Sequence, residues 1–390
     1  MIRLALLEMR RAPRRFVPTV AVLATVVFLA LAVSALADGL LRASTGSLRN
    51  TDADLYVFAD GAQRNVLRSM LPDVLQLPVG FTTGVEDVGT IGFSPTAVLL
   101  PDDGEEHAVM AVSVSHAFAG RPNDVVAGRL PFDGEPRVTA IEERLTAEGI
   151  GLGDRIGVAD AFEVEVIGIV RDASYLLRPT IWLPPSEFAT VRNAALPEFD
   201  VDESLTSVLA VRSAAGADPA EVAAAIDETF AEALEEREEL ADVEGGIETV
   251  TSREAYRAIP GVASQQSTLR AMVVVVLVVA AAVMAIFLAL LTLERRPLLA
   301  GLMAAGIRQR TIIGSLAVQA VAAAVCGAIV GCLATAVLLA VAPASIPLHL
   351  TVTSLVTVTG GAVTAAGVGA IGFAATLRRL DPATELLTGR

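Results

Sequence analysis

The sequence predicts an α-helical membrane protein with four transmembrane helices and a mixed α/β extracytoplasmic domain inserted between helices 1 and 2. Three observations lead to this fold class. The mean hydropathy is +0.60 and 53% of the residues are hydrophobic, both above the values of an ordinary soluble domain. Residues 16–37, 271–293 and 311–377 contain no charged side chain. The long segment between the first two stretches is strongly acidic.

The first charge-free stretch, residues 16–37, predicts transmembrane helix 1. At about 1.5 Å per residue, its 22 residues can cross the roughly 30 Å hydrocarbon core. Residues 1–15 mix apolar and basic positions and predict a cytoplasmic interfacial helix, with a plain charged flank as the alternative. Ala35 and Ala37 resemble a signal-peptide cleavage site, but the apolar run exceeds the usual core of about 7–15 residues, so a retained span is favoured.

Residues 38–270 predict the extracytoplasmic α/β domain, with stalks at both ends and two lobes. Residues 162–170 alternate apolar and polar side chains in their first half, which is typical of a half-buried strand. The glycines of residues 151–155 indicate a turn before that strand. Residues 56–59 and 205–211 predict further strands.

Two helix starts are visible in the same domain. Asp218 followed by Pro219 predicts a capped helix start, and an apolar stripe then recurs every four residues at Val222, Ile226, Phe230 and Leu234. Residues 251–254 form a capping box, opening a helix that must bend or restart at residues 260–261, a Pro-Gly pair.

The remaining charge-free stretches complete the membrane domain. Residues 271–293 predict transmembrane helix 2 and residues 294–310 a cytoplasmic coupling loop or helix. The 67 residues of 311–377 are too long for one span and divide at Pro343 and Pro347. This gives helix 3 at 311–341, a short outer turn at 342–350, helix 4 at 351–377 and a cytoplasmic tail at 378–390.

Small residues predict close helix packing in the last two spans. Gly327 and Gly331 form a GxxxG pattern, and Gly361, Ala365 and Gly369 make a similar ridge in helix 4. The pattern is common and leaves open whether the contact is within one chain or between two; a contact within the chain is favoured.

Charge predicts the orientation. The three segments assigned to the cytoplasm contain 12 arginines and 4 acids, whereas residues 38–270 contain 17 arginines and 40 acids. Under the positive-inside rule, both termini are then cytoplasmic, in a multi-pass protein of a bacterial cytoplasmic membrane.

Composition excludes several kinds of chemistry. The chain has no lysine, so the GxxxxGK[ST] phosphate loop is absent and ATP hydrolysis requires another subunit. CxxC, HExxH and GxSxG motifs are also absent, so we expect no catalytic residues, no metal site and no intrinsic cofactor. Acidic pairs such as Glu142 and Glu143 are interpreted as solvated surface, and the acidic outer domain argues against a nucleic-acid partner.

The order of these elements, with a loop of the form E-R-…-L-x-A-x-G-…-R, resembles the MacB/FtsX-type ABC transporter permeases over the whole chain. The resemblance implies that the loop docks onto a separate ATPase. The residues that it assigns to ATPase coupling are Glu294, Arg295, Arg296, Leu302, Ala304 and Gly306 in the loop, and Asp381, Pro382 and Glu385 in the tail. Pro297, Leu298 and Ala300 depart from the more usual R-E-x-G pattern, which puts particular polar contacts in doubt.

Within that family the chain is most similar to the HrtB-type heme-exporter permeases, through residues 1–11, 52–56, 151–156, 169–172 and 346–351. This likeness makes heme the leading candidate substrate. The candidate substrate-binding residues near the outer mouth are His349, Tyr256, Met272, Gln265 and Gln266. The alternative for His349 is an interfacial side chain whose ring lies in the headgroup layer.

The resemblance also implies partners and a function. Two permease chains, expected to be identical, would pair with two ABC ATPase subunits that bind ATP and magnesium, within membrane lipid. The complex would export or extract a hydrophobic or amphipathic molecule. Two alternatives remain: FtsX-like transmission of force or signal to a cell-wall hydrolase, and lipid or lipoprotein handling.

Overall fold

The structure is a computed structural model of the 390-residue chain. It describes residues 13–100, 106–114, 119–159, 161–195, 205–236, 246–304, 309–343 and 346–377. The chain divides into two compact units: unit 1 contains Met1–Gly39 and Gln265–Arg390, and unit 2 contains Leu40–Ser264. The predicted interfacial helix falls mainly on residues 1–12, outside the described residues, and residues 13–15 begin the first described helix.

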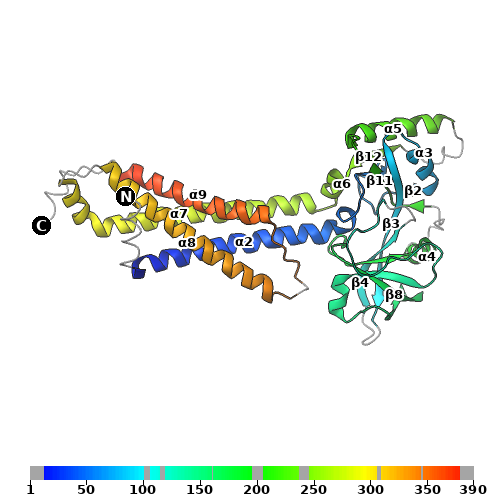
Figure 1. The fold of residues 1–390 in the computed structure, drawn as a ribbon, viewed down its shortest axis with the longest axis horizontal. Coiled ribbons are helices and arrows are strands. Elements are labelled where there is room, and N and C mark those ends of the chain that lie inside the picture. Colours follow the sequence, from blue (N-terminus) through cyan, green and yellow to red (C-terminus); the bar gives the residue numbers. More distant parts are fainter. Residues whose placement is uncertain are drawn as a thin grey trace. The chain divides into compact units, whose positions relative to one another are not determined.

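The long described helices are α2 (Pro13–Arg49), α7 (Val262–Ala304), α8 (Gln309–Val341) and α9 (Val352–Leu377), which Figure 1 follows along the chain. They belong to unit 1 except for residues 40–49 of α2 and 262–264 of α7, which belong to unit 2. All four are long and apolar enough to cross a membrane. Both α2 and α7 continue beyond the charge-free stretches. The absence of charged residues predicts only the part of a helix that lies in lipid, and polar residues can extend the same helix into water. Residues 294–304 of the predicted coupling loop are therefore a continuation of α7.

The small-residue ridges pack within the chain. A Cβ atom placed on Gly331 of α8 would lie 2.9 Å from the carbonyl oxygen of Ala24 and 2.9 Å from the Cβ of Val27, both on α2. On α9, a Cβ atom at Gly369 would lie 2.6 Å from the carbonyl oxygen of Ala281 on α7. Only glycine allows backbones to approach this closely, so the intrachain alternative is confirmed for both ridges.

Unit 2 is a mixed α/β domain. Its elements are β1 (Leu55–Ala59), β2 (Leu71–Pro72), η1 (Asp73–Leu75), α3 (Gln76–Gly80), β3 (Val85–Leu99), β4 (Glu106–Val114), β5 (Val125–Gly128), β6 (Val138–Glu142), η2 (Glu143–Glu148), β7 (Arg155–Val158), β8 (Phe162–Val170), β9 (Thr180–Leu183), α4 (Pro185–Ala195), β10 (Leu205–Thr206), β11 (Val208–Ser213), α5 (Pro219–Glu236), β12 (Ile247–Thr251) and α6 (Ser252–Ala258).

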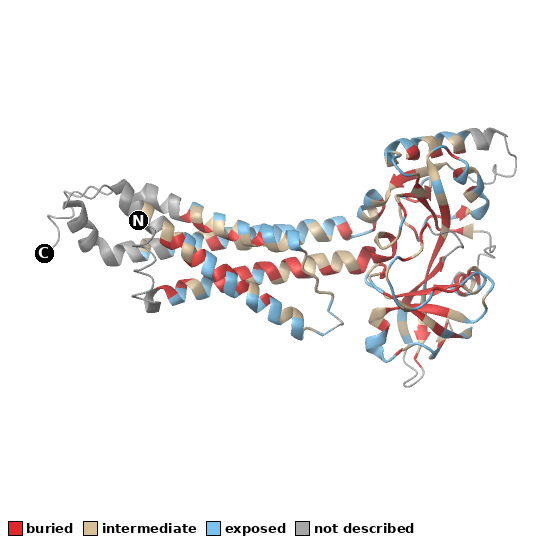
Figure 2. Cartoon of the chain, viewed as in Figure 1, coloured by how far each residue is buried: buried red, intermediate tan, exposed pale blue. Residues whose placement is uncertain are grey.

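One sheet joins ten of these strands in the order β12-β1-β11-β3-β4-β9-β6-β8-β5, with β7 pairing both β3 and β8. The second contact of β7 closes a circuit of six strands, β3-β4-β9-β6-β8-β7. The 15-residue strand β3 belongs both to this circuit and to the β12-β1-β11 side of the sheet. Figure 2 shows the buried residues concentrated in these strands.

Several local predictions are confirmed. Strand β8 covers residues 162–170, with Val164 and Val166 buried and Glu163 and Glu165 exposed. The capping box at Thr251 is present, and the chain restarts as α7 at Val262 after Pro260 and Gly261.

The stripe on α5 is also present in the described residues. Val222, Ile226 and Phe230 are buried against β1, β11 and α3 in one apolar cluster. At the start of the same helix, the side chain of Asp218 accepts a 3.0 Å hydrogen bond from the backbone N–H of Ala220.

The strand predicted at residues 205–211 is present but interrupted at Ser207, and its two parts, β10 and β11, belong to different sheets. The backbone N–H of Ser207 donates to the carbonyl of Ile91, and its hydroxyl accepts from the N–H of Phe93. One interpretation was wrong. Glu142 is not solvated surface: it is 3% exposed, since its carboxylate accepts a hydrogen bond from Ser174 in the loop that covers the end of β6.

Candidate functional site

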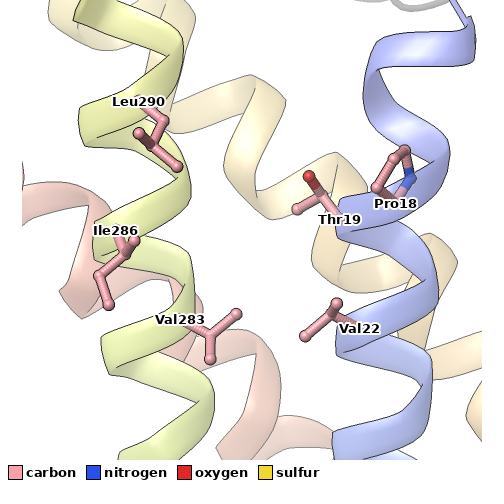
Figure 3. A pocket seen from close by; sticks show the side chains of 6 residues that line it. All are labelled: Pro18, Thr19, Val22, Val283, Ile286 and Leu290. Carbon is pink, nitrogen blue, oxygen red and sulfur yellow. The ribbon is translucent and has the colours of Figure 1, made fainter.

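An apolar pocket of about 240 Å³ lies between α2 and α7 in unit 1. Figure 3 shows the side chains that line it from the two helices. They are Pro18, Thr19 and Val22 of α2 and Val283, Ile286 and Leu290 of α7. None of the six lining residues carries a charge, so the pocket suits an apolar group such as a hydrocarbon chain or the face of a flat ring.

The pocket wall contains one polar atom with no partner. Thr19 is 4% exposed, and its hydroxyl has no hydrogen-bond partner among the described residues. Thr25, two turns later on α2, instead donates a 2.9 Å bond to the carbonyl of Ala21, the usual arrangement for threonine in a helix. A buried hydroxyl without a partner costs about 1–3 kcal/mol.

A second arrangement ties α2 to the turn between α8 and α9, all within unit 1. The carboxylate of Asp38 accepts hydrogen bonds from the hydroxyl of Thr351 at 2.8 Å, the hydroxyl of Ser354 at 2.6 Å and the backbone N–H of Thr351 at 3.2 Å. The Thr351 hydroxyl also accepts from the N–H of Ser354 and so caps α9. A negative charge at this helix start is favourable because the N-terminus of α9 carries a partial positive charge.

The backbone of the same turn lies directly on α2. The N–H of His349 donates a 3.0 Å bond to the carbonyl of Ala35. A Cβ atom at Gly39 would lie 1.8 Å from the carbonyl oxygen of Pro347, so this position admits only glycine. The turn that carries His349 is thus held to α2 by main-chain contacts and by Asp38.

The last two turns of α2, which belong to unit 2, dock onto the loop between β8 and β9. We call residues 171–178 the β8–β9 loop. The N–H of Ser47 donates to the carbonyl of Ser174 at 3.0 Å, and the N–H of Leu177 donates to the carbonyl of Ala43 at 2.9 Å. A Cβ atom at Gly46 would lie 2.6 Å from the carbonyl oxygen of Asp172, which shows how closely the two backbones approach.

Ion pairs reinforce this docking. The carboxylate of Asp172 accepts from Arg49 at 2.5 Å and from Arg42 at 3.3 Å. Both arginines are on α2, one at the beginning and one at the end of the docked segment. The side chain of Asp172 is 21% exposed, so the pairs are partly shielded from water and salt.

The predicted substrate residues lie on several elements. Tyr256 is on α6, half-buried against the core of unit 2, and Gln265 and Gln266 are half-buried in the first turns of α7. Met272 is 50% exposed on α7, and His349 is half-buried in the turn before α9. Their assignment to a substrate stays a prediction.

The predicted coupling residues lie either where the structure describes the backbone alone or outside the described residues. Glu294, Arg295, Arg296, Leu302 and Ala304 are on the last turns of α7, with side chains outside the described set. Gly306, Asp381, Pro382 and Glu385 lie outside the described residues.

Sequence reasoning missed Thr19, Asp38 and Asp172. Asp38 had a visible signal, since it is the first charge after a 22-residue charge-free run, and Thr351 and Ser354 have N-cap spacing. Thr19 and Asp172 had no visible signal in the sequence, because the residues that surround them come from chain segments far away in sequence.

Comparison with protein-family models gives two matches that together cover most of the chain. Residues 17–229 match the model described as MacB-like periplasmic core domain, which is more than half of the chain. Residues 270–382 match the model described as FtsX-like permease C-terminal.

Solved structures resemble part of the chain. The extracellular domain of the noncanonic ABC-type transporter YknZ from Gram-positive bacteria matches with a TM-score of 0.37 and 12% identity, covering 50% of this chain and 98% of that one. The periplasmic region of MacB from Actinobacillus actinomycetemcomitans matches with a TM-score of 0.37 and 12% identity, covering 55% of this chain and 96% of that one.

Proposed function

Because the chain belongs to the MacB/FtsX family of ABC transporter permeases, we propose that it couples ATP hydrolysis by a separate ATPase subunit to the export or extraction of a hydrophobic or amphipathic molecule. Permeases of this family work with ABC ATPase partners, often as dimers. The chain itself has no lysine and therefore no phosphate-binding loop of the GxxxxGK[ST] type.

The observation that carries the proposal is the pocket between α2 and α7. Its lining is apolar, and the helices that form it are long and apolar enough to lie in a bilayer. A molecule dissolved in the membrane can enter such a pocket sideways, without crossing an aqueous channel. Residues 16–37, 271–293 and 311–377 have no charged side chain, unlike the spans of ion and proton pathways.

The proposed topology is a multi-pass protein of the cytoplasmic membrane with both termini and the α7–α8 connection in the cytoplasm. The arginine excess in these three segments supports it, as does the acidic composition of residues 38–270. The partners in this proposal are two ATPase copies and a second permease chain of the same sequence.

A pocket-filling variant tests the proposal. In the reconstituted complex, hemin, lipids and amphipathic drugs are each added and ATPase stimulation is measured. We expect Val283→Trp to abolish stimulation by the active compound, since the larger ring fills the pocket. The matched control is Val275→Trp on the same helix, where the native side chain is 60% exposed, and it should respond like wild type. Equal responses of both variants would exclude the pocket.

Heme is the leading substrate in the proposal, with His349 its candidate ligand. Titrating hemin into the purified protein and its His349→Ala variant should give a shifted Soret band that weakens in the variant. An unchanged Soret band in both proteins would exclude heme as the substrate. In the ATPase assay, stimulation by lipids alone would favour lipid or lipoprotein handling.

Force or signal transmission is the second candidate function, and the docking of α2 favours it. One 37-residue helix connects a predicted span to the β8–β9 loop through backbone hydrogen bonds and the Asp172 ion pairs. Such a connection can transmit movement without moving a substrate. ATPase activity that no tested compound stimulates would support this function over export.

The ATPase is proposed to dock at residues 294–310. Arg295→Glu with Arg296→Glu, or Leu302→Pro, should prevent co-purification of the ATPase while membrane insertion stays normal. The control carries Arg253→Glu with Arg257→Glu, two exposed arginines on α6 in unit 2. Normal yield of ATPase with Leu302→Pro would contradict this docking position.

A further inference from the structure

A buried carboxylic acid lies beneath the β8–β9 loop. Glu142 ends strand β6 and is 3% exposed. One carboxylate oxygen accepts a 2.5 Å hydrogen bond from the hydroxyl of Ser174, and the backbone N–H of Thr180 also favours the charged form of the group. Ser174 is the residue whose carbonyl accepts the bond from Ser47 of α2, so Glu142 contacts the residue that holds α2.

Among the described residues no cation forms an ion pair with the Glu142 carboxylate. Arg144, on η2, donates to the hydroxyl of Ser174 at 3.2 Å and to the carbonyl of Leu177 at 3.3 Å rather than to the carboxylate. Asp172 brings a second negative charge from the loop, and its own partners are Arg42 and Arg49 of α2. Tyr175 adds a buried phenol in the loop, and burial raises its pKa above the usual value of 10.

The loop itself has an unfavourable backbone. Asp172, Leu176 and Leu177 have φ angles of 54°, 50° and 68°, in the left-handed region that non-glycine residues rarely adopt. The N–H groups of Leu176 and Leu177 donate to the carbonyls of Ser44 and Ala43 on α2. The docking contacts therefore hold the loop in a conformation that it would leave if they weakened.

We propose that Glu142 makes the β8–β9 loop a proton-controlled latch on α2, which is closed when Glu142 is protonated and released when Glu142 ionises. Ionisation puts a second negative charge near Asp172, in a place with little water. Opening of the loop admits water to that charge and breaks the hydrogen bonds of Ser47, Leu176 and Leu177. The latch involves residues of unit 2 alone. The proposal therefore does not depend on which molecule the permease moves.

The direction follows from the environment of Glu142. Burial raises its pKa from 4.5 to about 7; the Ser174 hydrogen bond, Arg144 and the backbone N–H of Thr180 oppose this rise, and Asp172 adds to it. Because the closed state has the raised pKa, its extra stability is complete below pH 4.5 and is lost as the pH rises through 7. An acidic exterior would close the latch and a neutral or alkaline one would loosen it.

Hydrogen exchange of the full-length protein in nanodiscs tests the latch, since the amides of Ser47, Leu176 and Leu177 form its bonds. Protection factors, corrected for the intrinsic pH dependence of exchange, are compared at pH 5.5 and pH 8.5. Wild type should lose roughly tenfold protection in peptides covering residues 43–49 and 174–178. The amides pairing β1 with β12 serve as an internal reference and should change little.

Two variants decide the outcome. Glu142→Gln fixes the neutral form and should keep protection equal at both pH values. Glu148→Gln is the matched control, because Glu148 is exposed at the end of η2, and it should behave like wild type. Equal protection of wild type at both pH values, or a pH response retained in Glu142→Gln, would overturn the proposal.

If Glu142→Gln does not fold, Ser174→Ala provides the test. It keeps Glu142 but removes the hydrogen bond that favours ionisation, so the midpoint of the pH response should move upward. An unmoved midpoint would also overturn the latch.

Discussion

The carboxylate of Asp38 on α2 accepts a 2.6 Å hydrogen bond from the hydroxyl of Ser354 on α9, across 316 residues of sequence. Two more bonds from Thr351 reach the same carboxylate oxygen. Removing this group leaves the start of α9 without its acidic partner. We therefore expect Asp38→Ala to lower the free energy of unfolding in detergent by about 1–3 kcal/mol.

The control for Asp38→Ala is Thr357→Val, because the Thr357 side chain is exposed and its hydroxyl donates to the carbonyls of Thr353 and Ser354 in its own helix. Its stability should stay close to wild type. Equal losses in the two variants would show that Asp38 has no special part in holding α9.

The glycine contacts between helices predict a second difference. Gly331→Leu should lower the thermal unfolding midpoint, because its side chain would meet Ala24 and Val27 of α2, and overpacking of this kind costs about 1–3 kcal/mol. Gly367→Leu on α9 is the matched control, since a Cβ atom there has no neighbour within 4 Å. If both substitutions were tolerated, the α2–α8 contact would not exist in the membrane.

Asp172 offers a substitution that separates charge from backbone strain. Asparagine keeps the left-handed conformation readily, so Asp172→Asn should lose only the ion pairs with Arg42 and Arg49, about 1 kcal/mol at low salt. The loss should shrink at high salt because of screening. Asp172→Val should lose more at every salt concentration, and a salt-independent loss for asparagine would contradict the ion-pair explanation.

Glu142 predicts a pH dependence of stability. Its pKa of about 7 in the folded protein, against 4.5, means that folding is favoured most below pH 4.5 and loses on the order of 3 kcal/mol as the pH rises to about 7. Other acids titrate in the same range, so the quantity to measure is the difference between wild type and Glu142→Gln across pH 4–9. A constant difference would show that Glu142 is not buried in the folded state.

The sequence predicted those features whose physical cause is local. The capping box at Thr251 and the alternation of residues 162–170 need only neighbouring residues, and both are present. The charge-free stretches fall within helices that are long and apolar enough to cross a membrane, but they underestimated the lengths of α2 and α7, since polar residues continue both helices beyond the apolar part.

Features that depend on distant segments could not be read in this way. Glu142 and Glu143 look alike in sequence, yet one is buried by the β8–β9 loop and the other pairs with Arg171. Ser207 divides the expected strand at residues 205–211 because its bonding partners, Ile91 and Phe93, are on β3. The pocket likewise exists only because α2 and α7 pack against each other, and no local sequence pattern predicts that contact.

The left-handed residues of the β8–β9 loop make stability and function opposing targets for protein engineering. Each of Leu176 and Leu177 stores about 1–3 kcal/mol of backbone strain that glycine would relieve. A library selected for heat resistance alone should therefore accumulate glycine at Leu177, which is 42% exposed, whereas Leu176 packs against the core of unit 2. Such variants would survive heating but would hold α2 through a loop with less backbone strain. A screen for thermal stability would therefore select against the strain that allows the loop to release α2.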